Sequence, residues 1–108
     1  MPRYLSLFKY STEGTKGFLK EKASGREAAI RKAIESAGAK LELVYWVGTG
    51  EYSGIAISDF PDTATAAAFI AMVVSTGSFS EFRGIELLTA SEFDRALTKS
   101  VSYRPPGA

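Results

Sequence analysis

Few side chains in this sequence could carry out chemistry, because histidine and cysteine are both absent. Without them the chain lacks the commonest metal ligands, the usual general base at neutral pH and the usual axial ligands of haem. Carboxylates, lysine, tyrosine, serine and threonine are left. We therefore predict no metal site and no cofactor, and any site would consist of carboxylates and aromatic rings.

The candidate site residues lie on strands around a predicted β-hairpin at 45–58. Aromatic rings suit flat apolar molecules, since they offer a large contact area and, in Tyr and Trp, a polar group as well. A carboxylate buried beside such rings could act as a general base, because burial raises its pKa. No catalytic residue is assigned, and the candidates for ligand binding are Phe8, Tyr10, Trp46, Glu51, Tyr52, Arg83 and Glu86.

Each candidate also has a purely structural interpretation. Aromatic residues are enriched in subunit interfaces for the same physical reasons, and we favour that interpretation for the rings. Glu51, Arg83 and Glu86 could form ion pairs at the edge of a strand, and no nucleophile–base pair or metal cluster accompanies them. The ligand and packing interpretations are compatible if a subunit interface encloses a cavity.

Hydrophobic periodicity predicts the order β-α-β-β-α-β around this hairpin. Ser24 and Glu27 have the spacing of a capping box, as do Thr89 and Glu92, so each pair is expected to begin a helix. Residues 11–23 are predicted to be a loop, because Ser, Thr and Gly are mixed there with charged side chains. The predicted strands are 4–10, 40–47, 51–58 and 80–88, and the predicted helices are 24–37, 62–77 and a short one from Thr89.

Alternation along the strands predicts a sheet with two unlike faces. We expect the aliphatic face to pack against the helices. The other face carries Phe8, Trp46 and Tyr52, and it is too apolar to be left in water yet too polar for a dry core. Such a face is expected where the sheets of two subunits meet and enclose a space. The predicted core is Leu5, Leu7, Leu41, Leu43, Val47, Ile55, Ile57, Ile85 and Leu87.

The predicted helix at 62–77 is apolar nearly all round, with no charged residue between Asp62 and Glu81. Packing one side of it on a sheet would leave the other side in water. We therefore expect a homo-oligomer, a dimer or higher, formed through the sheet face and this helix.

The composition is that of one globular domain, since 45% of the 108 residues are apolar and 23% are charged. We predict a single domain at 1–98 and a polar tail at 99–108.

The net charge of +1 conceals a basic stretch at 1–40, but no docking motif with interleaved aromatic residues accompanies it. We therefore predict no nucleic-acid partner. No signal pattern or membrane-length apolar run is present, which favours a cytoplasmic protein without membrane contact.

Several short motifs carry a resemblance to a known family. The opening Pro-x-Tyr-Leu-Ser-Leu-x-Lys-Tyr, followed by Leu-Glu-x-x-Tyr-Trp and Gly-Glu-Tyr, resembles the GYD-domain family of small bacterial proteins over roughly residues 2–97. The resemblance implies a ferredoxin-like α+β fold of the dimeric α/β-barrel type. It implies a four-stranded antiparallel sheet with two helices on one face and a short C-terminal helix. The family hairpin usually reads Gly-Glu-Tyr-Asp, whereas Ser53 follows Tyr52 here.

Three classes of function stay open at this point. The first is an oligomer that binds a small apolar or aromatic molecule or serves a structural role. The second, implied by the resemblance, is a cofactor-independent enzyme of dimeric α/β-barrel type, such as an oxygenase or isomerase. The third is a regulatory module that senses a metabolite. A cavity beside Trp46 and Tyr52 would favour the first two classes.

Overall fold

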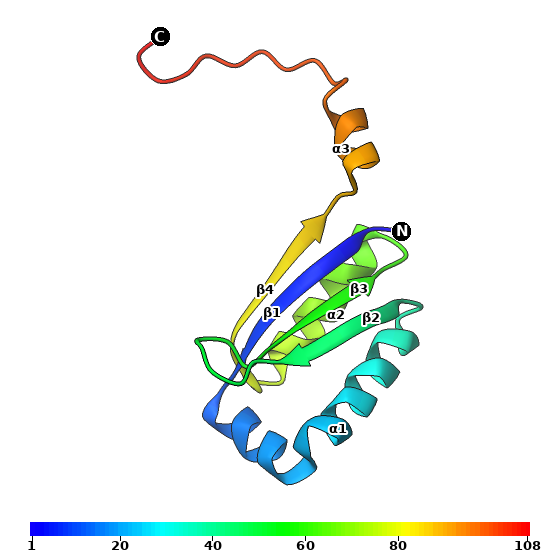
Figure 1. Ribbon diagram of the computed structural model, residues 1–108, viewed down its shortest axis with the longest axis vertical. Helices are drawn as coiled ribbons and strands as arrows, with labels where there is room; N and C mark the ends of the chain where they lie inside the picture. The colour runs from blue at the N-terminus through cyan, green and yellow to red at the C-terminus, as the bar shows by residue number, and fades with distance from the viewer.

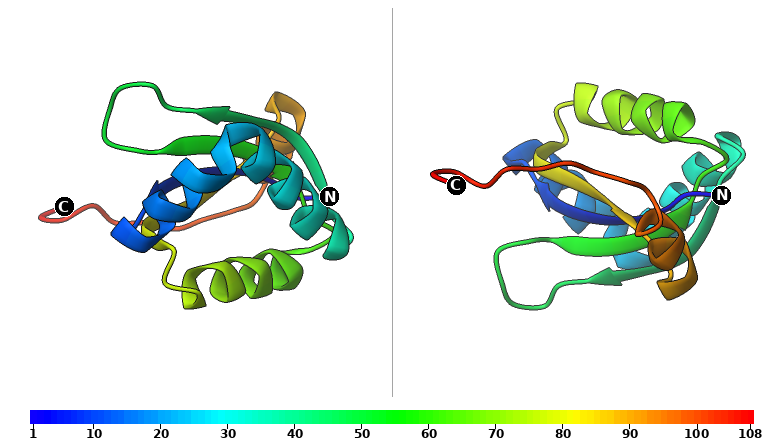
Figure 2. Two further views of the ribbon diagram at one scale, coloured as in Figure 1. Left: turned by 90° about the horizontal axis from the view of Figure 1, so that it is seen from below. Right: turned by 90° about the horizontal axis from the view of Figure 1, so that it is seen from above.

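The computed structural model describes residues 1–108 and has the element order β-α-β-β-α-β-α (Figure 1). All neighbouring strands are antiparallel, and the sheet order is β2-β3-β1-β4. Both long helices lie on one side of this sheet (Figure 2). The predicted ferredoxin-like α+β arrangement is therefore confirmed. The strands are β1 (Arg3–Tyr10), β2 (Lys40–Trp46), β3 (Gly54–Asp59) and β4 (Phe79–Leu87), and the helices are α1 (Thr12–Ser36), α2 (Thr63–Ser75) and α3 (Ala90–Ala96).

The prediction of which sheet face packs against the helices was wrong. The buried residues of β1 are Tyr4, Phe8 and Tyr10, and Ile30 of α1 and Phe69 of α2 pack against the core that includes Tyr4. Both faces are apolar enough to be buried, so alternation alone does not identify the inner one. Both long helices contribute alanines to the helix side, and large rings on the sheet fill the space that small helix residues leave.

The aliphatic face of the sheet is consequently the one without a covering layer. We call it the open sheet face, and strand register defines it, because directly paired residues in antiparallel strands share a face. Leu5 pairs with both Ile57 and Ile85, for example. Its apolar residues are Leu5, Leu7, Leu43, Tyr45, Ile55, Ile57, Ile85 and Leu87.

A β-bulge in β2 explains a second departure from the predicted core. Leu41 pairs with Ser58 and Leu43 pairs with Ile57, so Glu42 is an extra residue in the ladder. The bulge reverses the alternation, which places Leu41 in the helix-side core while Leu43 stays on the open sheet face. A strict period of two had put both leucines on one face.

The predicted loop at 11–23 is wrong, because this segment forms the first part of α1. Ser11 is the N-cap, and its Oγ accepts a hydrogen bond from the Gly14 backbone N–H at 3.1 Å. The same hydroxyl donates to the Gly77 carbonyl at 2.8 Å, which ties the start of α1 to the approach to β4. The helix kinks at Lys22, whose φ is 67°, so the Ser24 capping pattern follows a break inside the helix and does not begin it.

The other predicted helix boundaries agree with the structure. Asp62 caps α2 by accepting a hydrogen bond from the Thr65 backbone N–H at 2.7 Å. Thr89 and Glu92 form the complete capping box that begins α3. Gly38 follows α1 with φ of 71°, a left-handed conformation that glycine adopts without strain.

The C-terminal part of the chain leaves the body of the molecule (Figure 1). We call α3 and residues 97–108 the C-terminal arm. Its apolar side chains Phe93, Leu97, Val101 and Tyr103 are all more than half exposed. The radius of gyration is 16.7 Å, compared with about 13 Å for a compact domain of this length. The arm is thus unsupported by its own chain, and the division at residue 98 stays a prediction.

Two glycines of α1 provide a matched test of how the helix start is attached. A Cβ at Gly14 would overlap the Ser78 carbonyl oxygen, whereas a Cβ at Gly17 would meet nothing within 4 Å. We expect Gly14→Ala to lower the free energy of unfolding by about 1–3 kcal/mol through overpacking. Gly17→Ala should raise it by about 0.5–1 kcal/mol, since alanine is the better helix former. Urea unfolding measures both, and equal effects would show that α1 does not pack here.

Candidate functional site

A cluster of six aromatic rings lies at the end of the sheet where β1 and β2 end and β4 begins, next to the first part of α1. Phe8 is at its middle, 4% exposed, with ring centroids at 5.7 Å from each of Tyr10, Trp46 and Phe79 in edge-to-face contacts. Such contacts stabilise by about 0.5–1.5 kcal/mol each beyond the area they bury. We call these residues the ring cluster: Phe8, Tyr10, Phe18, Trp46, Phe79 and Phe82.

Gly54 makes the position of Phe8 possible. The two residues pair directly across β1 and β3, and a Cβ on Gly54 would come within 2.5 Å of the Phe8 Cζ atom. The missing side chain therefore creates the space into which the Phe8 ring lies flat on β3. Glycine is required here for close approach, not for an unusual φ.

Tyr10 brings a polar group into the ring cluster. Its ring stacks on Phe79 at 5.1 Å and on Phe18 at 5.5 Å between centroids. Its hydroxyl is buried and has no hydrogen-bond partner. Burial raises the pKa of this phenol, and the guanidinium of Arg26 on α1 opposes the shift. Tyr10 is accordingly a neutral hydroxyl at neutral pH, close to a cation.

A cleft of about 320 Å³ lies between α1 and α2 above β1 and β3. This is at the small end of the range for ligand sites. Phe8, Phe79 and Phe82 of the ring cluster line it together with Phe69 of α2. Its polar lining consists of Ser6, Arg26, Ser58, Thr76 and Ser78. We call this feature the interhelical cleft, and its mixture of rings and a few polar groups is typical of small-molecule sites.

The structure divides the seven predicted site residues among three places. Phe8 lines the interhelical cleft, while Tyr10 and Trp46 contact Phe8 within the ring cluster. Glu86 lies toward the far end of β4, where its carboxylate accepts a hydrogen bond from the Tyr4 hydroxyl at 3.3 Å. The remaining three, Glu51, Tyr52 and Arg83, interact with one another near the β2–β3 connection.

Tyr52 belongs to a surface network at that connection. Its interaction with the Glu81 carboxylate raises the pKa of the Tyr52 phenol, and the same contact lowers the pKa of Glu81. Arg83 lies 3.5 Å from Glu81, measured between Nε and Oε2. These groups lie outside the interhelical cleft, so the hairpin contributes Trp46 to the ring cluster but no cleft residue through Tyr52.

Sequence reasoning missed most of the cleft lining. Ser6, Ser58 and Phe82 fall on the same sheet face as Phe8, and their alternation with the aliphatic residues was a usable signal. Arg26 and Phe69 are on helices, and nothing in the spacing of charged and apolar residues there marks these two as lining a cleft. Only the crossing of α1 and α2 over the sheet brings them to the same place.

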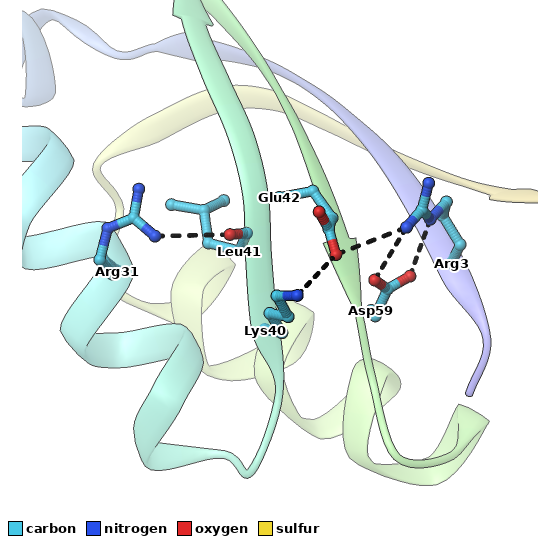
Figure 3. Close-up of polar contacts among 6 residues, drawn as sticks. All are labelled: Arg3, Arg31, Lys40, Leu41, Glu42 and Asp59. Carbon is cyan, nitrogen blue, oxygen red and sulfur yellow. Dashed lines mark hydrogen bonds and ion pairs between the residues drawn. The ribbon is translucent and has the colours of Figure 1, made fainter.

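A wider hollow lies at the opposite end of the open sheet face, and charged residues that pair with one another dominate it (Figure 3). Arg3 donates two hydrogen bonds to Asp59, at 2.8 and 3.0 Å. Glu42 lies 3.5 Å from both Arg3 and Lys40, measured between nitrogen and oxygen. Arg31 on the other side of the sheet donates to the Leu41 carbonyl beside the bulge at 3.4 Å. Because these charged groups already pair with one another, they form a lock across β1, β2 and β3. They are therefore less available to a ligand than the polar groups of the interhelical cleft.

Comparison with known families gives a clear assignment. A family model described as the GYD domain matches residues 4–97. The chain belongs to the GYD-domain family. This match confirms the resemblance of the opening strand and the hairpin, and it covers every residue of the ring cluster and the interhelical cleft.

A similar solved structure is the crystal structure of an uncharacterized NIPSNAP domain protein from Burkholderia xenovorans. It is 13% identical with a TM-score of 0.48, and the alignment covers 84% of the GYD chain and 96% of the other chain. No curated protein matches the GYD chain. None of its helices combines the length and apolar character needed to cross a bilayer, and no three acidic side chains are grouped as metal ligands.

The lock around Asp59 predicts a pH-dependent stability. Arg3 lowers the pKa of Asp59 below its ordinary value of 3.8, so the stabilisation is complete above that value and disappears as pH falls through the lowered pKa. Asp59→Asn should cost at most about 1 kcal/mol at pH 7, because the pair is partly exposed. In strong acid, wild type and variant should have equal stability. Urea unfolding at both pH values, with Asp94→Asn in the C-terminal arm as control, measures this. An equal loss at both pH values would contradict it.

Proposed function

We propose that this GYD-domain chain forms a homo-oligomer that binds a small aromatic or apolar molecule in the interhelical cleft. The observation that carries the proposal is the combination, in one cleft, of three ring-cluster phenylalanines with a few polar side chains. Rings supply contact area, and isolated polar groups fix orientation. Ser58 supports this argument, since it is only 2% exposed overall yet lines the cleft, where its hydroxyl is available to a ligand.

The ring cluster favours a flat ligand over a bulky one. Phe79 and Phe82 meet edge to face at 5.6 Å, and Phe8 and Phe82 are nearly parallel at 6.5 Å between centroids. These fixed rings present faces and edges to a cleft of small volume, so a planar molecule gains contact without moving them. The oxygenase or isomerase alternative and the metabolite-sensing alternative both require such a binding step. A cytoplasmic location stays a prediction from the sequence.

The open sheet face supports the oligomeric part of the proposal. The chain exposes 7439 Å², while a compact monomer of this mass is expected to expose about 5,800 Å². The C-terminal arm, whose residues are all exposed, contributes to this excess, and the open sheet face adds Tyr45 and Ile85, which are 65% and 43% exposed. At one end of the open sheet face lies the lock around Asp59, and at the other lie Glu81 and Arg83.

A second copy is the occupant that this face fits. The apolar centre and charged rim have the composition of a protein interface, and both ends carry paired charges of both signs. Two such faces can therefore meet without burying an uncompensated charge. The outer side of α2, which exposes Ala67, Ala71 and Met72, is a second apolar surface and the other contact predicted from the sequence.

Narrowing the interhelical cleft should weaken ligand binding. Ala33 of α1 lines the cleft but is exposed, so Ala33→Leu adds volume there without overpacking the core. We expect an aromatic ligand, found by screening a small library through Trp46 fluorescence, to bind at least about tenfold more weakly to this variant. Ala68→Leu on the outer part of α2 is the control and should bind as wild type does. An equal response of both variants would place the ligand elsewhere.

The oligomer can be tested with one charge on each candidate surface. Ile85 is 43% exposed on the open sheet face, and Met72 is 69% exposed on α2. If the sheets meet, Ile85→Lys should convert the oligomer to a monomer at micromolar concentration, because lysine would be buried without a partner. Met72→Lys should leave it assembled. Light scattering over a dilution series distinguishes the two, and a wild-type monomer at these concentrations would contradict the proposal.

A further inference from the structure

The polar lining of the interhelical cleft carries positive charge and no negative charge. Arg26 is the only charged residue among the fifteen that line it, and the other polar groups are hydroxyls of serine and threonine. No carboxylate faces the space. The cleft therefore offers one cation and several neutral hydrogen-bonding groups beside aromatic rings.

The kink of α1 determines which side chains lie next to Arg26. The break at Lys22 brings Glu21 and Arg26 together, with Oε1 and Nη1 at 3.5 Å, although they are five positions apart in sequence. The side chain of Arg26 is 28% exposed and that of Glu21 is 48% exposed, so the pair is partly hydrated and has a single contact. A guanidinium carries five N–H donors, which leaves donors of Arg26 free for a second acceptor.

A second polar group lies beside Arg26 without a partner. The Tyr10 hydroxyl belongs to a residue that is 8% exposed, and it makes no hydrogen bond within the chain. A buried hydroxyl without a hydrogen-bond partner destabilises the fold, and a bound ligand would supply that partner. Arg26 is thus a cationic donor in the lining of an aromatic cleft without a carboxylate, and the Tyr10 hydroxyl lies near Arg26 although Tyr10 does not itself line the cleft.

We infer that the molecule bound in the interhelical cleft is an aromatic anion, whose ring lies against Phe79 and Phe82 and whose carboxylate or similar group is held by Arg26. This inference rests on the proposed binding function of the same cleft. A carboxylate matches the planar guanidinium by accepting two parallel hydrogen bonds. An aromatic cation would be repelled by Arg26, and a neutral molecule would leave its free donors unmatched.

The test compares three probes of equal ring size: 2-naphthoate, 2-naphthalenemethanol and 2-naphthylmethylammonium. Calorimetric titration of the full chain should show 2-naphthoate binding at least about tenfold more tightly than the alcohol, as a charge-assisted hydrogen bond implies, with the ammonium compound weakest. Arg26→Gln should abolish the difference between naphthoate and alcohol while leaving alcohol binding within about twofold of its original value. Arg26→Lys should restore part of the preference.

Lys32→Gln is the matched control. Lys32 is an exposed residue of α1 that does not line the cleft, and its loss changes the net charge by the same amount as Arg26→Gln. It should leave the binding of all three probes unchanged. Equal losses of naphthoate binding in the two variants would reveal general attraction to a basic helix and overturn the inference.

The outcomes separate this inference from the proposed function. If naphthoate and the alcohol bind equally and Arg26→Gln changes neither, the anion preference is refuted while the cleft is retained as a binding site. If none of the probes binds, the proposed function fails with these ligands. Amide chemical shifts give the location: changes confined to the open sheet face, instead of residues such as Ser58 and Phe82, would contradict both.

Discussion

The packing of Phe8 onto Gly54 is the constraint on which the rest of the structure depends. Because β3 has no side chain at this point, the Phe8 ring lies against its backbone and meets rings from β1, β2 and β4. Phe18 at the start of α1 completes the ring cluster by packing against Trp46 at 4.9 Å. Three strands and one helix are therefore held by one group of side chains.

That arrangement decides the character of both sheet faces. Once the rings are on the helix side, the aliphatic residues must face away from both helices, and no part of the chain covers them. The interhelical cleft lies between α1 and α2 above β1 and β3, with Ala29 and Ala33 of α1 and rings of the sheet in its lining. A single choice of inner face thus produces a surface suited to a partner and a cleft suited to a small molecule.

The two features lie on opposite sides of the sheet and use different residues. Assembly through Ile85 and its neighbours would leave the interhelical cleft accessible, since none of the cleft residues belongs to the open sheet face. The kink at Lys22 lies on the helix side of the sheet, where Arg26 pairs with Glu21 and lines the cleft. Ligand binding and oligomerisation can accordingly be altered by separate substitutions.

The order of elements, the caps at Asp62 and Thr89 and the family could all be determined from the sequence, because they depend on local spacing and short motifs. The ring cluster was foreseen in part, through Phe8, Tyr10 and Trp46. The inner face of the sheet and the helix at 12–23 were not. Two apolar faces have the same period, the Glu42 bulge inverts one strand within a single residue, and α1 begins where Ser11 bonds to Gly77, far away in sequence. Those outcomes depend on contacts between distant segments, which only the tertiary structure decides.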